Sequence, residues 1–413
     1  MNKIGLFGFG CVGQGFYQLL QRSQFGEAIV KKIVVKSKDK QRPFEDLPIA
    51  YHPDEIFGDE EIDIIIEAIN DADEAFEIVS LALSKRIPVI TANKKMVAEH
   101  LDELIHLQKK HKTPLLYEAA VCGAIPIINI LEEQFGHEHI DSMTGIFNGT
   151  SNYILSRLFK DNIAYEKALS RAQELGFAEK DPTSDVGGFD SKYKSIILAK
   201  HAYGLSFRPE DIFNFGIDGI TTDDIGFARK KGFKIKLAPI IFHQGQHVGI
   251  YILPHFFDIE HQLYGVEEEF NSVIVEGEHA GRQVYSGKGA GSFPTAFSLL
   301  NDLKRVIAGY SYRYIKSESE YQKINPKDLM IELYVRYEDD AVKDALEFEH
   351  ITEGFLNDGY KYVMGETSLD ILLKNKELFQ RVGSSIIATG RKRIRENEPI
   401  NIASTNEYLV SNE

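Results

Sequence analysis

The sequence predicts an α/β protein whose N-terminal part is a doubly wound parallel β-sheet. A short apolar strand at residues 3–7 leads directly into a glycine-rich turn, and apolar strands then alternate with helical patterns as far as residue 117. From Pro326 onward the texture changes, and short strand-like and helical segments alternate again. We therefore expect an α+β domain for substrate binding and dimerisation in the middle, and a small βαβ-like segment at the C-terminal end.

The turn after the first strand has the spacing of a dinucleotide-binding site. Residues 8–13 read Gly-Phe-Gly-Cys-Val-Gly and open a helical pattern that reaches Leu20. Gly8 permits the tight turn, Gly10 lets the backbone approach a pyrophosphate, and Gly13 lets the helix pack close to the strand. The phosphates would lie at the positive N-terminus of that helix. In such a Rossmann-type domain, the residues expected to contact the cofactor are Phe9, Gly10, Cys11, Val12 and Gly13.

The end of the second predicted strand, residues 32–35, favours NADP. An NAD site usually places an acidic residue there, which accepts hydrogen bonds from the ribose hydroxyls. Here the strand runs into Lys36-Ser37-Lys38-Asp39-Lys40. Lys36 and Lys38 could pair with a 2'-phosphate, although a solvated loop would look the same. Asp39 lies slightly late for an NAD site but would still allow NAD.

A third strand end presents further candidate residues. Residues 62–68 form a continuous apolar strand, residues 72–84 are helical, and a further buried strand at 88–90 ends in Thr91-Ala92-Asn93-Lys94. Because ligands collect at the carboxyl ends of strands in open parallel sheets, we expect Lys94 near the nicotinamide and Thr91 and Asn93 near the cofactor. The alternative is that Lys94 only starts a helix.

A Pro/Gly-rich turn carries an unusual density of charge. Between residues 172 and 194 it gathers three carboxylates and a lysine: Glu179, Asp185, Asp190 and Lys194. Charges on such a loop can converge on a small polar ligand, whereas charges along a helix face would be solvated. A helix is predicted from Asp190 onward, so Asp190 and Lys194 share one helical face and the carboxylate can hold the ammonium group. The alternative is a capped surface helix with an ordinary ion pair.

A second helix start could bind a carboxylate group. Residues 141–147 read as a strand and lead into Asn148-Gly149-Thr150, after which residues 153–159 are helical. Gly149 would offer a backbone amide and Thr150 a hydroxyl at this helix start. An ordinary helix cap would also use Thr or Asn at this place.

Composition narrows the class of protein. The net charge of -15 argues against nucleic acid or an anionic membrane surface as the main partner. No apolar run approaches the roughly 20 residues of a membrane span, and the first ten residues lack the pattern of a signal peptide. The two cysteines, Cys11 and Cys122, are too few for a disulfide framework. These observations fit a cytoplasmic enzyme best.

Five separated motifs, in the right order, resemble those of the homoserine dehydrogenases. The stretch from residue 172 to 194 closely resembles the family signature, and Thr91-Ala92-Asn93-Lys94 resembles the motif that holds a catalytic lysine. Three further segments also match, at residues 118–126, 145–150 and 287–295. The resemblance covers residues 1 to about 325.

The resemblance implies an NAD(P)-dependent interconversion of L-aspartate 4-semialdehyde and L-homoserine, on the route to threonine, methionine and isoleucine. Lys194 and Lys94 would carry the acid/base work, in an order that the sequence leaves open. Asp190 would orient Lys194 or the substrate hydroxyl, Glu179 would bind the substrate amino group, and Asp185 would support them. The alternatives are a related amino-acid dehydrogenase on the same scaffold and a cofactor-binding regulatory protein without catalysis.

The resemblance also implies a monovalent cation, sodium in the first instance. Glu118 would supply a side-chain oxygen, and Val121, Gly123 and Ile125 would supply backbone carbonyls. Oxygen ligands suit such a hard cation. The glycine-rich segment at residues 287–295 would return the chain to the cofactor, with Gly291 in contact with it.

The motifs also suggest the domain limits. We expect a dinucleotide-binding domain at residues 1–127, a catalytic domain at 128–294, a returning helix at 295–325 and a small domain at 326–413. Many relatives carry a regulatory ACT domain in the last place and form homodimers or higher homo-oligomers. The usual Asp-x-Pro-Gly loop is missing, because residues 336–340 contain neither Pro nor Gly. The segment is therefore expected to be ACT-like at most, with no sequence support for effector control.

Overall fold

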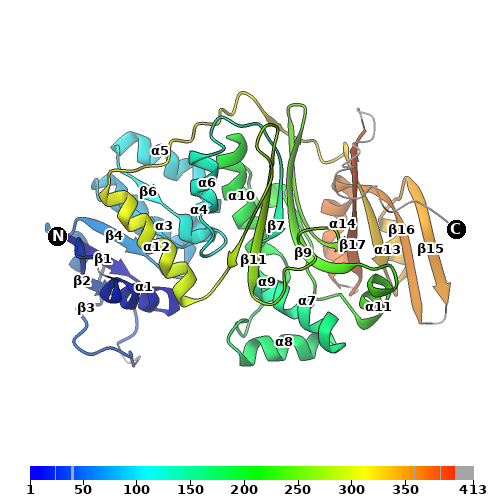
Figure 1. Cartoon of the computed structure of the whole chain (residues 1–413), viewed down its shortest axis with the longest axis horizontal. Coiled ribbons are helices and arrows are strands. Elements are labelled where there is room, and N and C mark those ends of the chain that lie inside the picture. Colours follow the sequence, from blue (N-terminus) through cyan, green and yellow to red (C-terminus); the bar gives the residue numbers. More distant parts are fainter. Residues whose placement is uncertain (24, 39–40, 358, 382, 396–413) are drawn as a thin grey trace. The chain divides into compact units, whose positions relative to one another are not determined.

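The structure, a computed structural model, describes residues 1–23, 25–38, 41–357, 359–381 and 383–395. Asp39 and the charged end of the chain, residues 396–413, lie outside the described residues. The chain divides into two compact units, shown as ribbons in Figure 1. The first unit comprises residues 1–138, 196–209 and 287–317, and the second comprises 139–195, 210–286 and the described residues from 318 onward. The predicted domain limits stay predictions.

The first unit is built on a six-stranded parallel sheet in the order β3-β2-β1-β4-β5-β6. This order confirms the doubly wound sheet, and its direction of winding reverses between β1 and β4, where such sheets bind ligands. The predicted second strand begins earlier than expected, at Ala28. The strands are β1 (Asn2–Phe7), β2 (Ala28–Val34), β3 (Ile49–Ala50), β4 (Ile64–Glu67), β5 (Val89–Thr91) and β6 (Leu115–Leu116).

Helices cover this sheet on both sides. In the centre of β1, Ile4, Leu6 and Phe7 are all buried, as expected for a strand that is covered on both faces. The returning helix α12 packs against α1, and α3 packs against α5 (Figure 1). The helices are α1 (Cys11–Arg22), α2 (Asp54–Phe57), α3 (Ala72–Ser84), α4 (Lys94–Glu99), α5 (Leu101–His111), η1 (Glu118–Ala120), α6 (Ile127–Glu133) and α12 (Ser292–Ile307).

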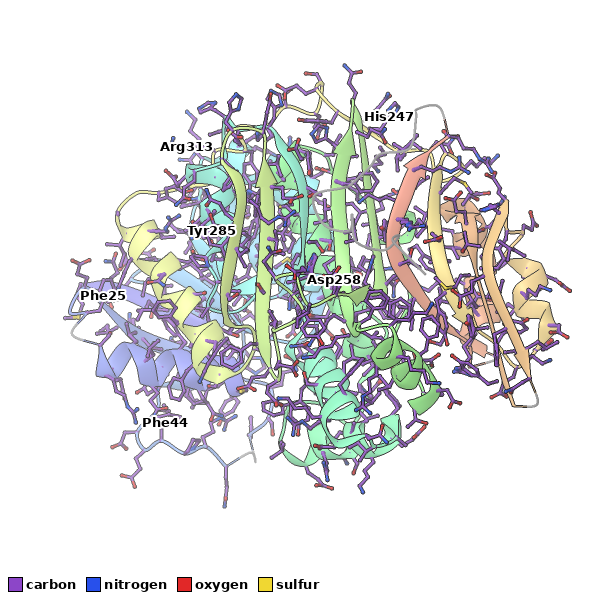
Figure 2. All side chains as sticks on the ribbon, turned by 45° about the vertical axis from the view of Figure 1, so that its right-hand side comes forward. Phe25, Phe44, His247, Asp258, Tyr285 and Arg313 are labelled. Atoms are coloured by element: carbon purple, nitrogen blue, oxygen red, sulfur yellow. The ribbon has the colours of Figure 1, made fainter. Side chains whose placement is uncertain are left out.

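The second unit contains an eleven-stranded sheet with the main order β12-β11-β7-β9-β10-β17-β14-β16-β15, while β8 and β13 also pair with β10. The sequence patterns gave no prediction for the long β9–β10 hairpin at its centre. Figure 2 labels His247, where β10 begins, and Asp258, directly after its end. The strands outside the C-terminal segment are β7 (Ile140–Ile146), β8 (Phe213–Asn214), β9 (Lys234–Gln244), β10 (His247–Phe257), β11 (Phe270–Gly277), β12 (Gly281–Lys288) and β13 (Gln322–Lys323).

The helices of the middle segment include the one predicted from Asp190 onward. This helix, α10, begins one residue earlier, and its buried residues include Ile196, Ile197 and Ala199. The chain passes from the second unit into the first along α10. The helices are α7 (Gly149–Asp161), α8 (Tyr165–Glu174), α9 (Thr183–Val186), α10 (Phe189–Tyr203), η2 (Pro209–Asp211) and α11 (Thr222–Lys230).

The C-terminal segment has the element order β-α-β-β-α-β, so two strands follow one another where the sequence predicts alternation of strands and helices. The extra strand, β15, escaped prediction because it is a sheet edge on which both faces are exposed, so its apolar residues do not alternate with polar ones. An ACT-type assignment stays a prediction. The elements are β14 (Leu329–Arg336), α13 (Asp340–Ala345), β15 (His350–Asn357), β16 (Tyr360–Ser368), α14 (Leu369–Arg381) and β17 (Ser385–Ile394).

Two further findings concern membrane-spanning helices and disulfide bonds. Within the described part of the chain, no helix combines the length and apolar character that a membrane span requires. Neither Cys11, which is exposed, nor Cys122, which is buried, takes part in a disulfide.

Candidate functional site

The first turn of α10 holds a buried ion pair. The Lys194 ammonium donates to Asp190 Oδ2 at 2.7 Å and to the backbone oxygen of Phe147 at 2.6 Å. Asp190 is 1% exposed and Lys194 6%. The predicted i, i+4 pairing is therefore confirmed, and its burial argues against an ordinary surface pair, which would be solvated. Two of the three ammonium hydrogens are fixed, so the third is available to a small ligand.

Asn148 joins the carboxylates of the charged turn. Its Nδ2 donates to Asp185 Oδ1 at 2.7 Å and to Asp190 Oδ2 at 3.0 Å, while its Oδ1 caps α7 by accepting from Ser151 N–H at 2.7 Å. Because the amide serves a helix start and two acids together, α7 and α10 are held around one polar cluster. The sequence identified Asn148 only as part of a helix start.

The turn before α10 depends on a glycine. Gly188 has a φ of +80°, a left-handed conformation that other residues adopt only with strain. A Cβ there would also lie 3.2 Å from the side chain of Ile252. The short helix α9 ends at Val186, Gly187 caps it, and α10 begins at Phe189 after the turn. The turn thus sets the direction in which Asp190 enters the cluster.

The other predicted substrate residues, Glu179, Gly149 and Thr150, make no hydrogen bond to this cluster in the part of the chain that the structure describes. Glu179 is exposed, and its carboxylate has no partner among the described residues. The Thr150 hydroxyl, expected to meet a carboxylate, instead donates to the backbone oxygen of Phe177 at 2.7 Å and so supports the segment that leads to Glu179. Gly149 begins α7, where a Cβ would come within 2.6 Å of the Glu269 oxygen.

In the first unit, the glycine turn has the geometry that a dinucleotide requires. A Cβ at Gly8 would lie 2.4 Å from the oxygen of Ala68, and one at Gly13 would lie 2.3 Å from the oxygen of Gly8. Gly10 caps α1 and has open space around it, so a ligand can approach its backbone.

The neighbours of this turn also come from the returning segment. Gly291 has a φ of +112° and directly precedes Ser292, whose hydroxyl donates to the oxygen of Cys11 at 2.6 Å. Phe9 points into a cluster with Tyr17 and Phe44, the latter labelled in Figure 2. Only the backbone of Phe9 is therefore placed for a cofactor contact.

Basic side chains follow β2, as predicted. Lys36 is exposed and pairs with Glu74 Oε2 at 2.5 Å, and the Lys38 ammonium lies 4.9 Å from the ring centroid of Tyr51. Arg42, which the sequence analysis missed, donates to the oxygen of Ser37 at 2.6 Å. Arg42 was not predicted because it lies several positions after the strand end, where a basic residue is not distinctive.

The ends of β4 and β5 share a buried hydrogen-bond network. The Thr91 hydroxyl donates to Glu67 and accepts from Asn93 N–H at 2.9 Å, and Asn93 caps α4 by accepting from Met96 N–H at 3.0 Å. Lys94 is the half-buried first residue of α4. Burial raises the pKa of Glu67 to about 7, although hydrogen bonds from Thr91 and Ile69 act in the opposite direction. Glu67 was not predicted as a site residue, although a single carboxylate at the end of an apolar strand could have indicated it.

The predicted cation ligand Glu118 forms a second group of buried acids together with Asp302. The Glu118 carboxylate accepts from the N–H groups of Ile128 and Asn129, both at 2.9 Å, and burial raises its pKa well above the usual value. Asp302 accepts the N–H of Glu118 at 2.9 Å, and burial raises the pKa of Asp302 to about 7.

The backbone around Glu118 turns sharply. Gly123 has a φ of +61°, and its oxygen accepts from Ser298 at 2.7 Å. Val121 and Ile125 take part in short backbone turns through Glu118 and Ile127. Asp302 Oδ1 is buried and has no hydrogen-bond partner among the described residues. Asp302 had no sequence signal, because it lies far away on α12.

A cavity of about 280 Å³ opens elsewhere in the second unit and contains none of the predicted site residues. Its lining includes Phe242, His255 and Lys392. The charged cluster around Asp190 is therefore the candidate site because of its buried polar contacts, and not because it lines this cavity.

Comparisons with known proteins agree on one family. A family model described as homoserine dehydrogenase matches residues 126–303, and one described as homoserine dehydrogenase, NAD binding domain, matches residues 8–118. The chain is 35% identical to the homoserine dehydrogenase of Bacillus subtilis (strain 168) over 378 residues, which is 87% of this chain and 86% of that protein.

Solved structures of this family have a similar fold. The homoserine dehydrogenase of Thiobacillus denitrificans matches with a TM-score of 0.81 and 27% identity, over 94% of this chain and 98% of that one. A hyperthermophilic archaeal homoserine dehydrogenase in complex with NADPH matches with a TM-score of 0.66 and 25% identity, over 76% of this chain and 99% of that one.

The raised pKa of Glu67 predicts a pH-dependent stability that Glu67→Gln removes. A carboxyl group whose pKa rises on folding stabilises the folded state fully only below its unfolded pKa, 4.5 here, and this contribution is lost as the pH rises through about 7. Between pH 4.5 and 8 the unfolding free energy of the variant should therefore gain up to about 3 kcal/mol relative to the wild type. Urea denaturation across this range measures the difference.

The control is Glu77→Gln, which removes an exposed carboxylate on α3. Its pH profile should run parallel to that of the wild type. If the Glu67→Gln profile also ran parallel, ionisation of buried Glu67 would not be the cause of the loss.

Proposed function

The chain belongs to the homoserine dehydrogenase family, and from this premise we propose how its residues carry out the reaction. The protein is an NAD(P)-dependent oxidoreductase of amino-acid biosynthesis that interconverts L-aspartate 4-semialdehyde and L-homoserine. When bound, the nicotinamide cofactor supplies or accepts the hydride. The buried pair of Asp190 and Lys194 is the observation on which the assignment of the catalytic residues rests.

Lys194 is the proposed acid/base residue. Its two fixed hydrogen bonds leave one N–H for the substrate oxygen, to which it donates a proton as the aldehyde becomes an alkoxide. In the opposite direction the amine accepts the hydroxyl proton. Asp190 holds the ammonium in place and counters its charge. Lys94, a residue of the first unit, is the second candidate for the acid/base residue.

The polar groups near the cluster suit the amino-acid end of the substrate. Glu179 presents a carboxylate without a partner among the described residues, which favours binding of the substrate ammonium. Asp185, held by Asn148, would add negative charge beside it. For the substrate carboxylate we propose the backbone amides of Gly149 and Thr150 at the start of α7, because the Thr150 hydroxyl proton is engaged by Phe177.

NADP is the proposed preferred cofactor, with NAD as the alternative. The exposed ammonium groups of Lys36 and Lys38 follow β2, where the adenosine ribose lies in domains of this type. Arg42 contributes a third positive charge to the same loop. The cofactor contacts proposed for the glycine turn use backbone groups from Phe9 to Gly13, and those proposed at the other end use Thr91, Asn93, Lys94 and Gly291.

The residues around Glu118 fit a monovalent cation. Asp302 Oδ1 is buried, has no hydrogen-bond partner in the part of the chain that the structure describes, and lies close to the buried carboxylate of Glu118. Two such acids are costly unless a positive charge joins them. We propose that Glu118 and Asp302 face a sodium ion together with backbone oxygens. The oxygens expected to take part belong to Val121, Gly123 and Ile125.

The assembly and location of the protein stay predictions. We propose a homodimer or higher homo-oligomer in the cytoplasm, by resemblance to the family. The small-molecule substrate requires neither a nucleic acid nor a membrane as partner.

We expect Lys194→Met to lower kcat for NADPH-dependent reduction of aspartate 4-semialdehyde by at least 100-fold, because a neutral thioether cannot transfer the proton. The matched control is Lys236→Met, which removes another buried lysine of the second unit, bonded to Asn152. The control should keep most of its kcat. Near-normal turnover of Lys194→Met would show that another residue, with Lys94 as the first choice, transfers the proton.

We expect Lys36→Asp to lower kcat/KM for NADPH by about tenfold or more and to change kcat/KM for NADH much less, because it removes a charge that pairs with the 2'-phosphate. Lys85→Asp, an exposed position at the end of α3, is the control with the same change of charge. An unchanged NADPH/NADH ratio would exclude Lys36 as a determinant of cofactor preference.

We expect sodium chloride to raise the melting temperature by about 2 to 4 °C over tetramethylammonium chloride at equal ionic strength, as a ligand of the folded state does. Asp302→Asn should abolish this difference, because it removes one of the two buried negative charges. Equal melting temperatures of the wild type in both salts would contradict the cation site, whatever the activity.

A further inference from the structure

A lysine of the C-terminal segment contacts a buried asparagine of the second unit. Lys376 lies on α14 and is half-buried, and its ammonium donates to Asn214 Oδ1 at 2.8 Å. Lys374, two residues earlier on the same helix, is 64% exposed and pairs with Asp370 at 2.6 Å. The two lysines therefore differ in surroundings, and only Lys376 has a buried partner.

Asn214 also contacts the turn before α10. The residue is fully buried on β8, which pairs with β10 at Ile252, and its Nδ2 donates to the oxygen of Gly187 at 2.7 Å. A charged ammonium accepts no hydrogen bond, so it can face only the oxygen of the amide. Lys376 thus fixes which way the Asn214 amide points and keeps its Nδ2 directed at Gly187.

A second contact from the same ammonium reaches the first residue of α10. Lys376 Nζ lies 5.1 Å from the ring centroid of Phe189, and Lys192 Nζ lies at the same distance from that ring. Burial, and then the charge of Lys192, lowers the pKa of Lys376 to about 8. The ammonium is held at this place despite that cost, which indicates that the aromatic ring and the amide oxygen stabilise it.

The turn held in this way carries the residues assigned to the reaction. Gly187 lies between Asp185 and Asp190, and Phe189 is the residue before Asp190. The matches to the two family models end at residue 118 and residue 303, so Lys376 lies outside both, whereas Asn214 and Gly187 lie inside. The contact therefore joins the C-terminal segment to the part of the chain that the family models describe.

We propose that Lys376 is a positioning residue of this enzyme, which orients the Asn214 amide and, through Gly187 and Phe189, holds the turn that places Asp185 and Asp190. This inference rests on the proposed function of the cluster. Its consequence is that the C-terminal segment supports the substrate site through its contacts with Asn214 and Phe189, without any effector.

The first test compares Lys376→Met with Lys374→Met by steady-state kinetics. Lys376→Met should raise KM for homoserine and lower kcat, by about ten- to hundredfold in kcat/KM, while KM for NADP stays within twofold. The cofactor residues belong to the first unit and should not respond. Lys374→Met should match the wild type, and Lys376→Arg, which restores a positive donor, should recover part of the loss.

A merely structural role would give a different result. Loss of folded protein would lower apparent kcat and leave both KM values unchanged, so that pattern would overturn the proposal. The proposal also requires that Lys376→Met add little in the background of Asn214→Leu, because the effect passes through that amide. Fully additive effects of the two substitutions would contradict this route.

A second measurement keeps the proposal separate from the assignment of function. Hydrogen exchange of the backbone amides in residues 183–190 should become faster in Lys376→Met and stay unchanged in Lys374→Met. If the wild type showed no homoserine turnover, the proposed function would fail, while this exchange would still decide whether Lys376 holds the turn. Equal exchange in both variants would overturn the positioning role.

Discussion

The buried ion pair between Asp190 and Lys194 is the interaction on which the candidate site depends. A charged group removed from water is costly by several kcal/mol unless an opposite charge and hydrogen bonds compensate it. Here Asp190 supplies the charge, and Phe147 and Asn148 supply the further hydrogen bonds. The pair therefore ties the end of β7, the start of α7 and the start of α10 to one position, and it leaves one ammonium hydrogen for a ligand.

In the first unit, the cost of burying charge falls on carboxylic acids alone. Glu67, Glu118 and Asp302 are all fully buried, and burial raises the pKa of each. Hydroxyl and backbone N–H groups satisfy Glu67 and Glu118, whereas one oxygen of Asp302 has no such partner among the described residues. Glu67 therefore has the contacts of a structural carboxylate, whereas Glu118 and Asp302 together form the pair that we propose faces a cation.

Much of the fold was predictable because local patterns were strong. Helix α3 has the predicted limits, and the glycine turn has the predicted tight contacts of Gly8 and Gly13. The hairpin of β9 and β10 and the edge strand β15 were not predicted, since pairing between distant segments, or exposure on both faces, leaves no clear period. The same holds for the site. Lys194 has a helical partner four residues away, whereas the acids that Asn148 contacts and the partners of Asn214 and Lys376 lie far away in the sequence.

The sequence by itself determined the family, the parallel sheet and the residue types that serve the chemistry, because the glycine turn and the charged turn are contiguous segments whose spacing is meaningful. Only the tertiary structure decided which atoms meet. It directed the Thr150 hydroxyl to Phe177 instead of a ligand and brought Lys376 to Asn214 across 162 positions. The physical reason is that a buried polar atom must find a partner, and the folded chain supplies that partner from whichever segment is nearest in space.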